Sequence, residues 1–220
     1  MNDISQMRSM DQPRWVGLLR SVLQADGRAY GLLFLLCAIG MIFPFWAGAV
    51  LPFQDYAGNM SYVAILHGAG VEGSLYDQIY ETGHLLTPNG LYFWLSVWVG
   101  TMVGPFTAGK IMLSVYALAL PYSVDMLLRA VGRDRRLALL SFPMVYNSSL
   151  VMGFVSYATA IPLGIATIAL AFRYRDNPSW RSGAWVASLA GLTFIGHADC
   201  GPSVADTKYR PTKTSKRSYS

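Results

Sequence analysis

The chain has 220 residues, of which 53% are hydrophobic and 13% are charged, and its formal net charge is +5. Soluble domains carry about 25% charged residues, so this composition, together with several long uncharged runs, excludes an ordinary soluble domain and indicates a polytopic membrane protein. The two cysteines, Cys37 and Cys200, lie too far apart in the sequence to suggest a disulfide framework or a cysteine-based metal site.

The basic residues are unevenly distributed along the chain. No Lys or Arg occurs between Arg28 and Lys110, and the basic clusters lie instead within residues 8–28, 129–136 and 173–181. Basic clusters beside hydrophobic spans normally mark the cytoplasmic side of a membrane. Membrane topology therefore explains these clusters, and we expect no nucleic-acid partner.

The first elements are a polar lead and a long uncharged run. Residues 1–28 are expected to form a cytoplasmic lead, in which apolar residues at helical spacing favour a short helix on the membrane surface. From Gly31 to Phe53 no residue is charged, and at about 1.5 Å per residue this run can cross a hydrocarbon core of about 30 Å. The backbone in lipid must satisfy its own hydrogen bonds, so we expect a first helical span at roughly 30–52. No small-residue cleavage motif follows it, and we interpret it as a retained signal-anchor.

Residues 54–87 are expected to form a polar, acidic loop on the far side of the membrane. A helix from Asp55 to Leu66 is predicted within it, because four apolar residues fall on one stripe. They are Tyr56, Met60, Val63 and Leu66. A second short helix is expected from Ser74 to Glu81.

The segment 88–128 contains two apolar runs separated by Gly104-Pro105, and the positions of the basic residues indicate which of them crosses. If both runs crossed, the four arginines of 129–136 would lie outside. If residues 89–103 instead lie along the outer interface, eleven of the twelve basic residues in 1–198 lie on the cytoplasmic side. Lys110 is then the one basic residue of this part of the chain on the external side. The positive-inside rule favours the second arrangement, which predicts an interfacial helix at 89–103 and a span at 111–128.

Three further spans are expected at 137–151, 154–172 and 184–197. The transmembrane domain would then occupy residues 29–198, as an all-α bundle of about five crossing helices with external juxtamembrane helices. Residues 199–220 are polar and basic and cannot bury enough apolar area to fold. We expect either an ordinary disordered tail or a reading frame interrupted near Ala198, which would make the chain an inactive fragment.

Asp55 is the first candidate for chemistry, because it follows the first span directly in the sequence Pro52-Phe53-Gln54-Asp55-Tyr56. A carboxylate at the membrane surface can act as a general base or hold a cation. The alternative is structural, since an aspartate that opens a helix can cap its free amides. The residues alone favour the capping role.

A cytoplasmic lead, one span and an acidic residue at the start of a large external loop resemble the C-type (GT-C) glycosyltransferase superfamily. The segments 146–147 and 153–157 and the pair Gly196-His197 resemble bacterial polytopic membrane proteins of the same general architecture. The resemblance runs from about residue 30 to residue 198. The superfamily uses lipid-phosphate-linked sugars and has its catalytic acidic residue just after the first span, at the position of Asp55.

The resemblance implies roles for several residues of the external side. Asp55 would deprotonate an acceptor hydroxyl, and Lys110 would balance the charge of the leaving phosphate; alternatively, Lys110 is an interfacial lysine whose amine reaches water. Glu81 and His84 are spaced to share one face of a helix, where they would bind substrate or a divalent cation, or would simply be solvated. Asn59 and Tyr146 complete the expected substrate-binding set.

The sequence therefore predicts an integral membrane protein of the bacterial inner membrane, with a cytoplasmic N-terminus. Its expected function is glycosyl transfer from a polyprenyl-phosphate-linked sugar, and the need for a divalent cation stays open. The alternative is a non-enzymatic transporter subunit or membrane scaffold. Transporters usually carry charged residues or broken helices at mid-membrane, whereas the charges here, including Lys110 and Asp125, are expected at span ends.

Overall fold

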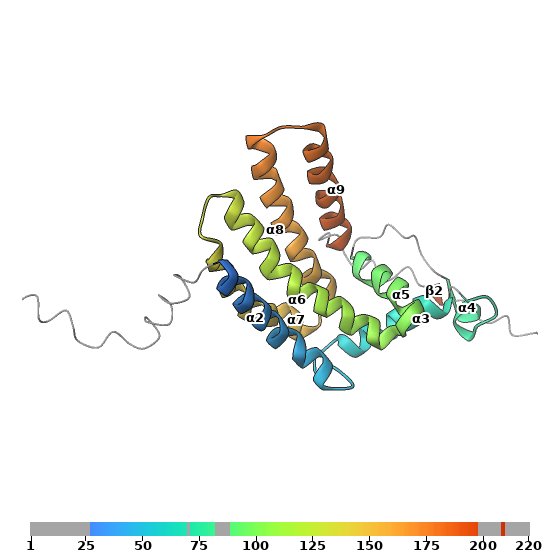
Figure 1. Ribbon diagram of the computed structural model, residues 1–220. Coiled ribbons are helices and arrows are strands. Elements are labelled where there is room, and N and C mark those ends of the chain that lie inside the picture. The colour runs from blue at the N-terminus through green and yellow to red at the C-terminus, as the bar shows by residue number, and fades with distance from the viewer. Residues whose placement is uncertain (1–26, 70, 82–88, 198–207, 210–220) are drawn as a thin grey trace, which may run out of the picture.

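The computed structural model describes residues 27–69, 71–81, 89–197 and 208–209, and it confirms the predicted all-α fold (Figure 1). The longer helices are α2 (Gly27–Ala47), α3 (Tyr56–Ala69), α5 (Leu91–Val103), α6 (Pro105–Ala130), α8 (Val155–Asp176) and α9 (Trp180–Gly196). The shorter elements are α4 (Leu75–Ile79), the 3₁₀ helices η2 (Arg135–Ser141) and η3 (Pro143–Tyr146), and α7 (Ser148–Met152). Two-residue strands, β1 (Tyr80–Glu81) and β2 (Lys208–Tyr209), pair in antiparallel orientation.

Three helices, α2, α6 and α8, are long and apolar enough to cross a membrane. Several large apolar side chains of α2 point outward, with Leu32 60% exposed and Phe43 68% exposed. Such a surface is unfavourable in water and suits a helix surrounded by lipid. Length and composition thus identify an integral membrane protein. Helix α5 has 13 residues and extends only about 20 Å, which is too short to cross the hydrocarbon core.

Helices α2 and α6 run antiparallel between two ends of the bundle. At one end the Tyr30 hydroxyl donates a hydrogen bond to Asp125, and at the other the Lys110 amine donates to the carbonyl of Gly48. We call the first the arginine end, because Arg129–Arg136 lie there, and the second the Asp55 end. Figure 1 shows α2 and α6 in blue and green.

The chain then returns to the Asp55 end through η2, η3 and α7. Along this path the Tyr146 hydroxyl donates to the carbonyl of Met41 at 2.7 Å, and the amide of Gln54 donates to the carbonyl of Val151 at 3.0 Å. Helix α8 leads back to the arginine end and α9 returns beside it, as Figure 1 shows. The described chain therefore passes five times between the two ends of the bundle, and three of these passes, α2, α6 and α8, are the helices long and apolar enough to cross a membrane.

The return segment differs from the single helix predicted at 137–151. Pro143 has no backbone N–H and begins η3. The Asn147 side chain then accepts a hydrogen bond from the Leu150 amide at 3.0 Å, which caps a new helix, α7. A 3₁₀ helix rises about 2.0 Å per residue, so these elements cover distance with fewer residues than an α-helix needs.

The core of the Asp55 end lies between α3, α5 and α6. The apolar stripe predicted on α3 is buried, with Tyr56 1% exposed and Met60 and Val63 0% exposed. Gly109 on α6 makes this packing possible, because a Cβ atom there would lie 2.5 Å from the Met60 sulfur. Burial also raises the pKa of Tyr56 to about 12, so this phenol stays neutral at physiological pH.

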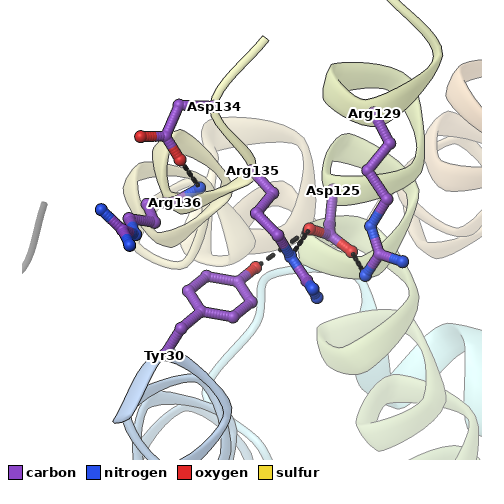
Figure 2. Close-up of polar contacts among 6 residues, drawn as sticks. All are labelled: Tyr30, Asp125, Arg129, Asp134, Arg135 and Arg136. Atoms are coloured by element: carbon purple, nitrogen blue, oxygen red, sulfur yellow. Dashed lines mark hydrogen bonds and ion pairs between the residues drawn. The ribbon is translucent and has the colours of Figure 1, made fainter. Parts of the chain in front are cut away.

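A buried carboxylate joins three elements at the arginine end (Figure 2). Asp125 on α6 is 2% exposed, and its two oxygens accept hydrogen bonds from Tyr30 on α2, from Arg129 one turn later on α6, and from Arg135 on η2. The Arg135 guanidinium also lies 4.5 Å from the centre of the Tyr30 ring. Because every partner comes from a different turn or element, Asp125 fixes how α2 and η2 pack on α6.

Candidate functional site

An open cavity of about 560 Å³ lies at the Asp55 end. Four segments that are distant in the sequence form it: the start of α3, the start of α5, the α7–α8 connection with the adjoining helix turns, and the end of α9. Its lining residues are Asp55, Asn59, Asn89, Phe93, Ser149, Gly153, Phe154, Val155, Ser156, Tyr157 and His197. It therefore brings together Asp55, the 153–157 segment and His197, three features that the sequence singles out separately.

Backbone hydrogen bonds hold Asp55 against the α7–α8 connection. The amide of Gln54 donates to the carbonyl of Val151, and the amide of Asp55 donates to the carbonyl of Met152 at 3.3 Å. The Asp55 carbonyl accepts from the Asn59 amide at 3.0 Å, at the start of α3. These contacts use only the main chain of Asp55, so its side chain stays available.

The Asp55 carboxylate is exposed, and within the described part of the chain it accepts no hydrogen bond from the first turn of α3 or from any other group. The amide of Tyr56 instead donates to the carbonyl of Phe53 at 3.2 Å. The capping role, which the residues alone favour, is therefore not seen in this geometry. The carboxylate faces the cavity as a free acceptor of protons or hydrogen bonds.

Gly153 allows the close approach of Asp55. Its φ angle is +91°, a left-handed conformation that glycine adopts without steric cost. A Cβ atom at this position would lie 2.7 Å from the Asp55 nitrogen and 2.8 Å from the Asp55 Cβ. The Asn59 side chain completes the connection by donating to the Gly153 carbonyl at 2.7 Å. A side chain at residue 153 would thus displace the candidate base.

His197, at the end of α9, also lines the cavity. Its Nδ1 lies 3.0 Å from Oδ1 of Asn89, and its ring packs edge-on against Tyr157 with 4.7 Å between centroids. Asn89 has a φ angle of 64°, and its carbonyl accepts a hydrogen bond from Ser156 at 3.0 Å. Asn89 therefore connects the start of α5 to α8 through Ser156 and to the end of α9 through His197, and the second contact orients the imidazole.

The cavity combines groups that suit a carbohydrate. Amide, hydroxyl and carboxylate groups can pair with sugar hydroxyls, and the rings of Phe93 and Tyr157 offer apolar faces. The lining contains no Lys or Arg among the described residues. Among the described lining residues, Asp55, Tyr157 and His197 carry ionisable side chains.

Two predicted site residues lie elsewhere. The Lys110 amine donates to the Gly48 carbonyl and lies 5.9 Å from the centre of the Trp46 ring, and Lys110 does not line the cavity. Tyr146 donates to Met41 and packs on Phe45 with 5.4 Å between ring centroids, inside the helix bundle. Among the members of the predicted substrate-binding set whose side chains the structure describes, Asn59 lines the cavity.

The predicted Glu81 and His84 pair cannot be placed as a pair. The backbone of Glu81 pairs with Lys208 in the two-residue sheet, whereas the Glu81 side chain and all of His84 lie outside the described residues. Within residues 27–69, 71–81, 89–197 and 208–209, no group of three or more His, Cys, Asp or Glu residues is arranged to hold a metal ion. Asp55 and His197 are the described residues of the cavity that could contribute ligands.

Sequence reasoning did not assign Asn89 or Ser149 to the site. Asn89 precedes Gly90, and Asn-Gly is a frequent turn sequence that tolerates a left-handed conformation, so the sequence contains a local signal for this turn. It contains no local signal that the turn meets His197, which follows more than one hundred residues later.

Comparison with protein-family models, with curated proteins and with solved structures finds no match for this chain.

Proposed function

We propose that this integral membrane protein is a glycosyltransferase that binds a sugar in the Asp55 cavity and takes it from a lipid-phosphate carrier. The observation that supports the proposal most directly is the exposed Asp55 carboxylate. It has no hydrogen-bond partner among the described residues and faces an open cavity that also holds an imidazole and several amide and hydroxyl groups. An aspartate with a structural role normally accepts hydrogen bonds from nearby amides with its carboxylate oxygens.

In the proposed reaction, Asp55 accepts the proton of an acceptor hydroxyl as that oxygen attacks the anomeric carbon of the sugar. The new carbon–oxygen bond forms as the bond between the anomeric carbon and the phosphate oxygen breaks, and the phosphate leaves with the electron pair. Asn59 and Asn89 would hold sugar hydroxyls, and Tyr157 would pack against the ring. Positioning of this kind supplies much of the rate of such transfers.

The leaving phosphate needs positive charge nearby. His197 is the described cavity residue that can carry it, since Lys110 is bound to Gly48 and Trp46. Asn89, 3.0 Å from the Nδ1 atom of His197, would keep the imidazole turned toward the cavity.

The transporter or scaffold alternative is less well supported by the position of the charges. On the three helices that could cross a membrane, the described charged residues lie within about two turns of a helix end, as Lys110 and Asp125 do on α6. Transport pathways usually place such residues near the middle of the membrane.

The test is Asp55→Asn, with Asp176→Asn as a matched control. The transfer of radiolabelled sugar from polyprenyl-phosphate to acceptor is followed in membranes that contain each variant. Asn keeps the size of the side chain and removes the proton acceptor, so we expect transfer to fall by about 10²- to 10⁴-fold. Asp176 pairs with Arg175 at the exposed end of α8, and its variant should keep full activity.

Both variants should reach the membrane in normal amounts, since the Asp55 carboxylate makes no structural hydrogen bond in the described chain. Undiminished transfer by Asp55→Asn would remove Asp55 from the chemistry and leave the non-enzymatic alternative. Equal losses in both variants would mean that the change acts through charge or expression rather than through proton transfer.

A further inference from the structure

The arginine end of the bundle carries more positive charge than its buried carboxylate can balance. Asp125 accepts from both Arg129 and Arg135, so one negative charge faces two guanidinium groups. The side chains of these arginines are 43% and 45% exposed, whereas that of Asp125 is 3% exposed. The carboxylate is thus enclosed, and the excess positive charge faces the surroundings of the protein.

Within the described part of the chain, the two guanidiniums use few of their donors in hydrogen bonds to Asp125. Arg129 uses one Nη2 group and Arg135 uses Nε in their bonds to Asp125, although each guanidinium carries five N–H donors. Asp125 and the Tyr30 ring hold the two groups in place, as Figure 2 shows. Two oriented guanidiniums form a favourable site for the oxygens of a phosphate.

An apolar groove lies on the side of the bundle between α2 and α6. It has a volume of about 350 Å³ and lies between Phe34 on α2 and four residues of α6, namely Val115, Leu118, Ala119 and Tyr122. Residues spaced by three, four and seven positions share one face of a helix, so Arg129 continues the line of Leu118 and Tyr122. At about 1.5 Å per residue, Arg129 lies about 10 Å beyond Tyr122 along the helix axis.

We propose that this groove and the arginine pair bind one anionic phospholipid. The phosphate would contact Arg129 and Arg135, and one acyl chain would lie in the groove between α2 and α6. The two halves of the site match the two halves of such a lipid in chemistry and in order along the helix axis. Basic pockets between transmembrane helices bind anionic headgroups for the same reason. This proposal does not depend on glycosyl transfer at the Asp55 end.

The test measures lipid binding to the purified full chain in detergent. Phosphatidylglycerol, phosphatidylcholine and inorganic phosphate are added separately, bound lipid is counted by native mass spectrometry, and the thermal unfolding midpoint is recorded. We expect phosphatidylglycerol to bind in a one-to-one complex and to raise the midpoint, with phosphatidylcholine and inorganic phosphate giving much smaller effects.

The charged half of the site is tested with Arg129→Gln, and Arg173→Gln is the control. Arg173 is exposed in the last turn of α8 at the same end, so both variants change the net charge equally. Loss of one arginine should weaken phosphatidylglycerol binding about fivefold, whereas the control should bind like the parent. Arg135 remains on Asp125 in the first variant, so the buried carboxylate keeps a partner.

The apolar half is tested with Leu118→Trp, which changes no charge and fills the groove. Leu36→Trp is its control, because Leu36 is 57% exposed on α2 and does not line the groove. Weaker binding by Leu118→Trp alone would support the proposal, even if Arg129→Gln cannot be purified. Equal binding of phosphatidylcholine, full stabilisation by inorganic phosphate, or unchanged binding by both test variants would each overturn it.

Discussion

Gly153→Ala tests whether Asp55 is held as the structure places it. The variant forces a side chain into a left-handed conformation, with φ at +91°, which costs about 1–2 kcal/mol for a residue other than glycine. The new Cβ would also lie 2.7–3.0 Å from three atoms of Asp55, whose backbone is anchored to Met152. Overpacking of this kind adds about 1–3 kcal/mol, so the free energy of unfolding should fall by about 2–5 kcal/mol.

Gly132→Ala is the matched control for this change. Gly132 has a φ angle of +66°, and a Cβ atom there would meet nothing within 4 Å. It should therefore lose only the conformational contribution of about 1–2 kcal/mol. Chemical unfolding in detergent, followed by circular dichroism, measures both variants. If Gly153→Ala is no less stable than Gly132→Ala, the α7–α8 connection does not pack on Asp55 and the cavity is not formed as described.

Two further predictions concern the first span and the core beneath the cavity. Ile39→Arg places a charge on a side chain of α2 that is 56% exposed, and it should reduce membrane insertion by about 2.5–3.5 kcal/mol in a translocon insertion assay; equal insertion would mean that α2 is not a lipid-facing span. Tyr56→Phe should make the protein less sensitive to alkali, because the folded state raises the pKa of Tyr56 from 10.0 to about 12. Between these pH values the unfolded chain loses a proton that the folded chain keeps, so the parent loses up to about 2 kcal/mol of stability as the pH rises and the variant does not. Parallel curves of unfolding free energy against pH for the two proteins would contradict that reasoning.

Patterns that repeat within one element predict the helices well. The predicted first span, roughly 30–52, lies largely in α2, which begins at Gly27 and ends at Ala47, because an uncharged run can be identified without knowing what it packs against. The α3 stripe is likewise buried as predicted, since apolar residues three and four apart on a helix necessarily share a face. Such information is local, so a single sequence contains it.

The site depends on contacts between distant segments, which local patterns do not determine. Asn59 meets Gly153 across 94 positions, and His197 meets Asn89 across 108. The sequence singled out the 153–157 segment and His197 only through a resemblance, and it grouped Asp55 with Lys110 because both were expected on one side of the membrane. Sharing a side does not bring two residues into one cavity, since the packing of α7 and α9 decides which residues meet.

The two carboxylates at opposite ends of the bundle show how burial separates a structural from a chemical role. Asp125 is 2% exposed and accepts from Tyr30, Arg129 and Arg135, whereas the exposed Asp55 side chain accepts from no described group. Asp125→Asn keeps the shape and removes the charge from three hydrogen bonds, and charge-assisted bonds contribute about 1.5–3 kcal/mol each. Because the half-exposed arginines can turn toward water, we expect a net loss of about 2 kcal/mol in the free energy of unfolding. Asp55→Asn should change that quantity by less than about 0.5 kcal/mol, as surface substitutions usually do. Unfolding of the two variants under identical conditions compares them directly. If Asp55→Asn lowers the free energy of unfolding as much as Asp125→Asn does, Asp55 is also a structural residue. Its proposed role as a base would then no longer follow from the lack of hydrogen-bond partners for its carboxylate.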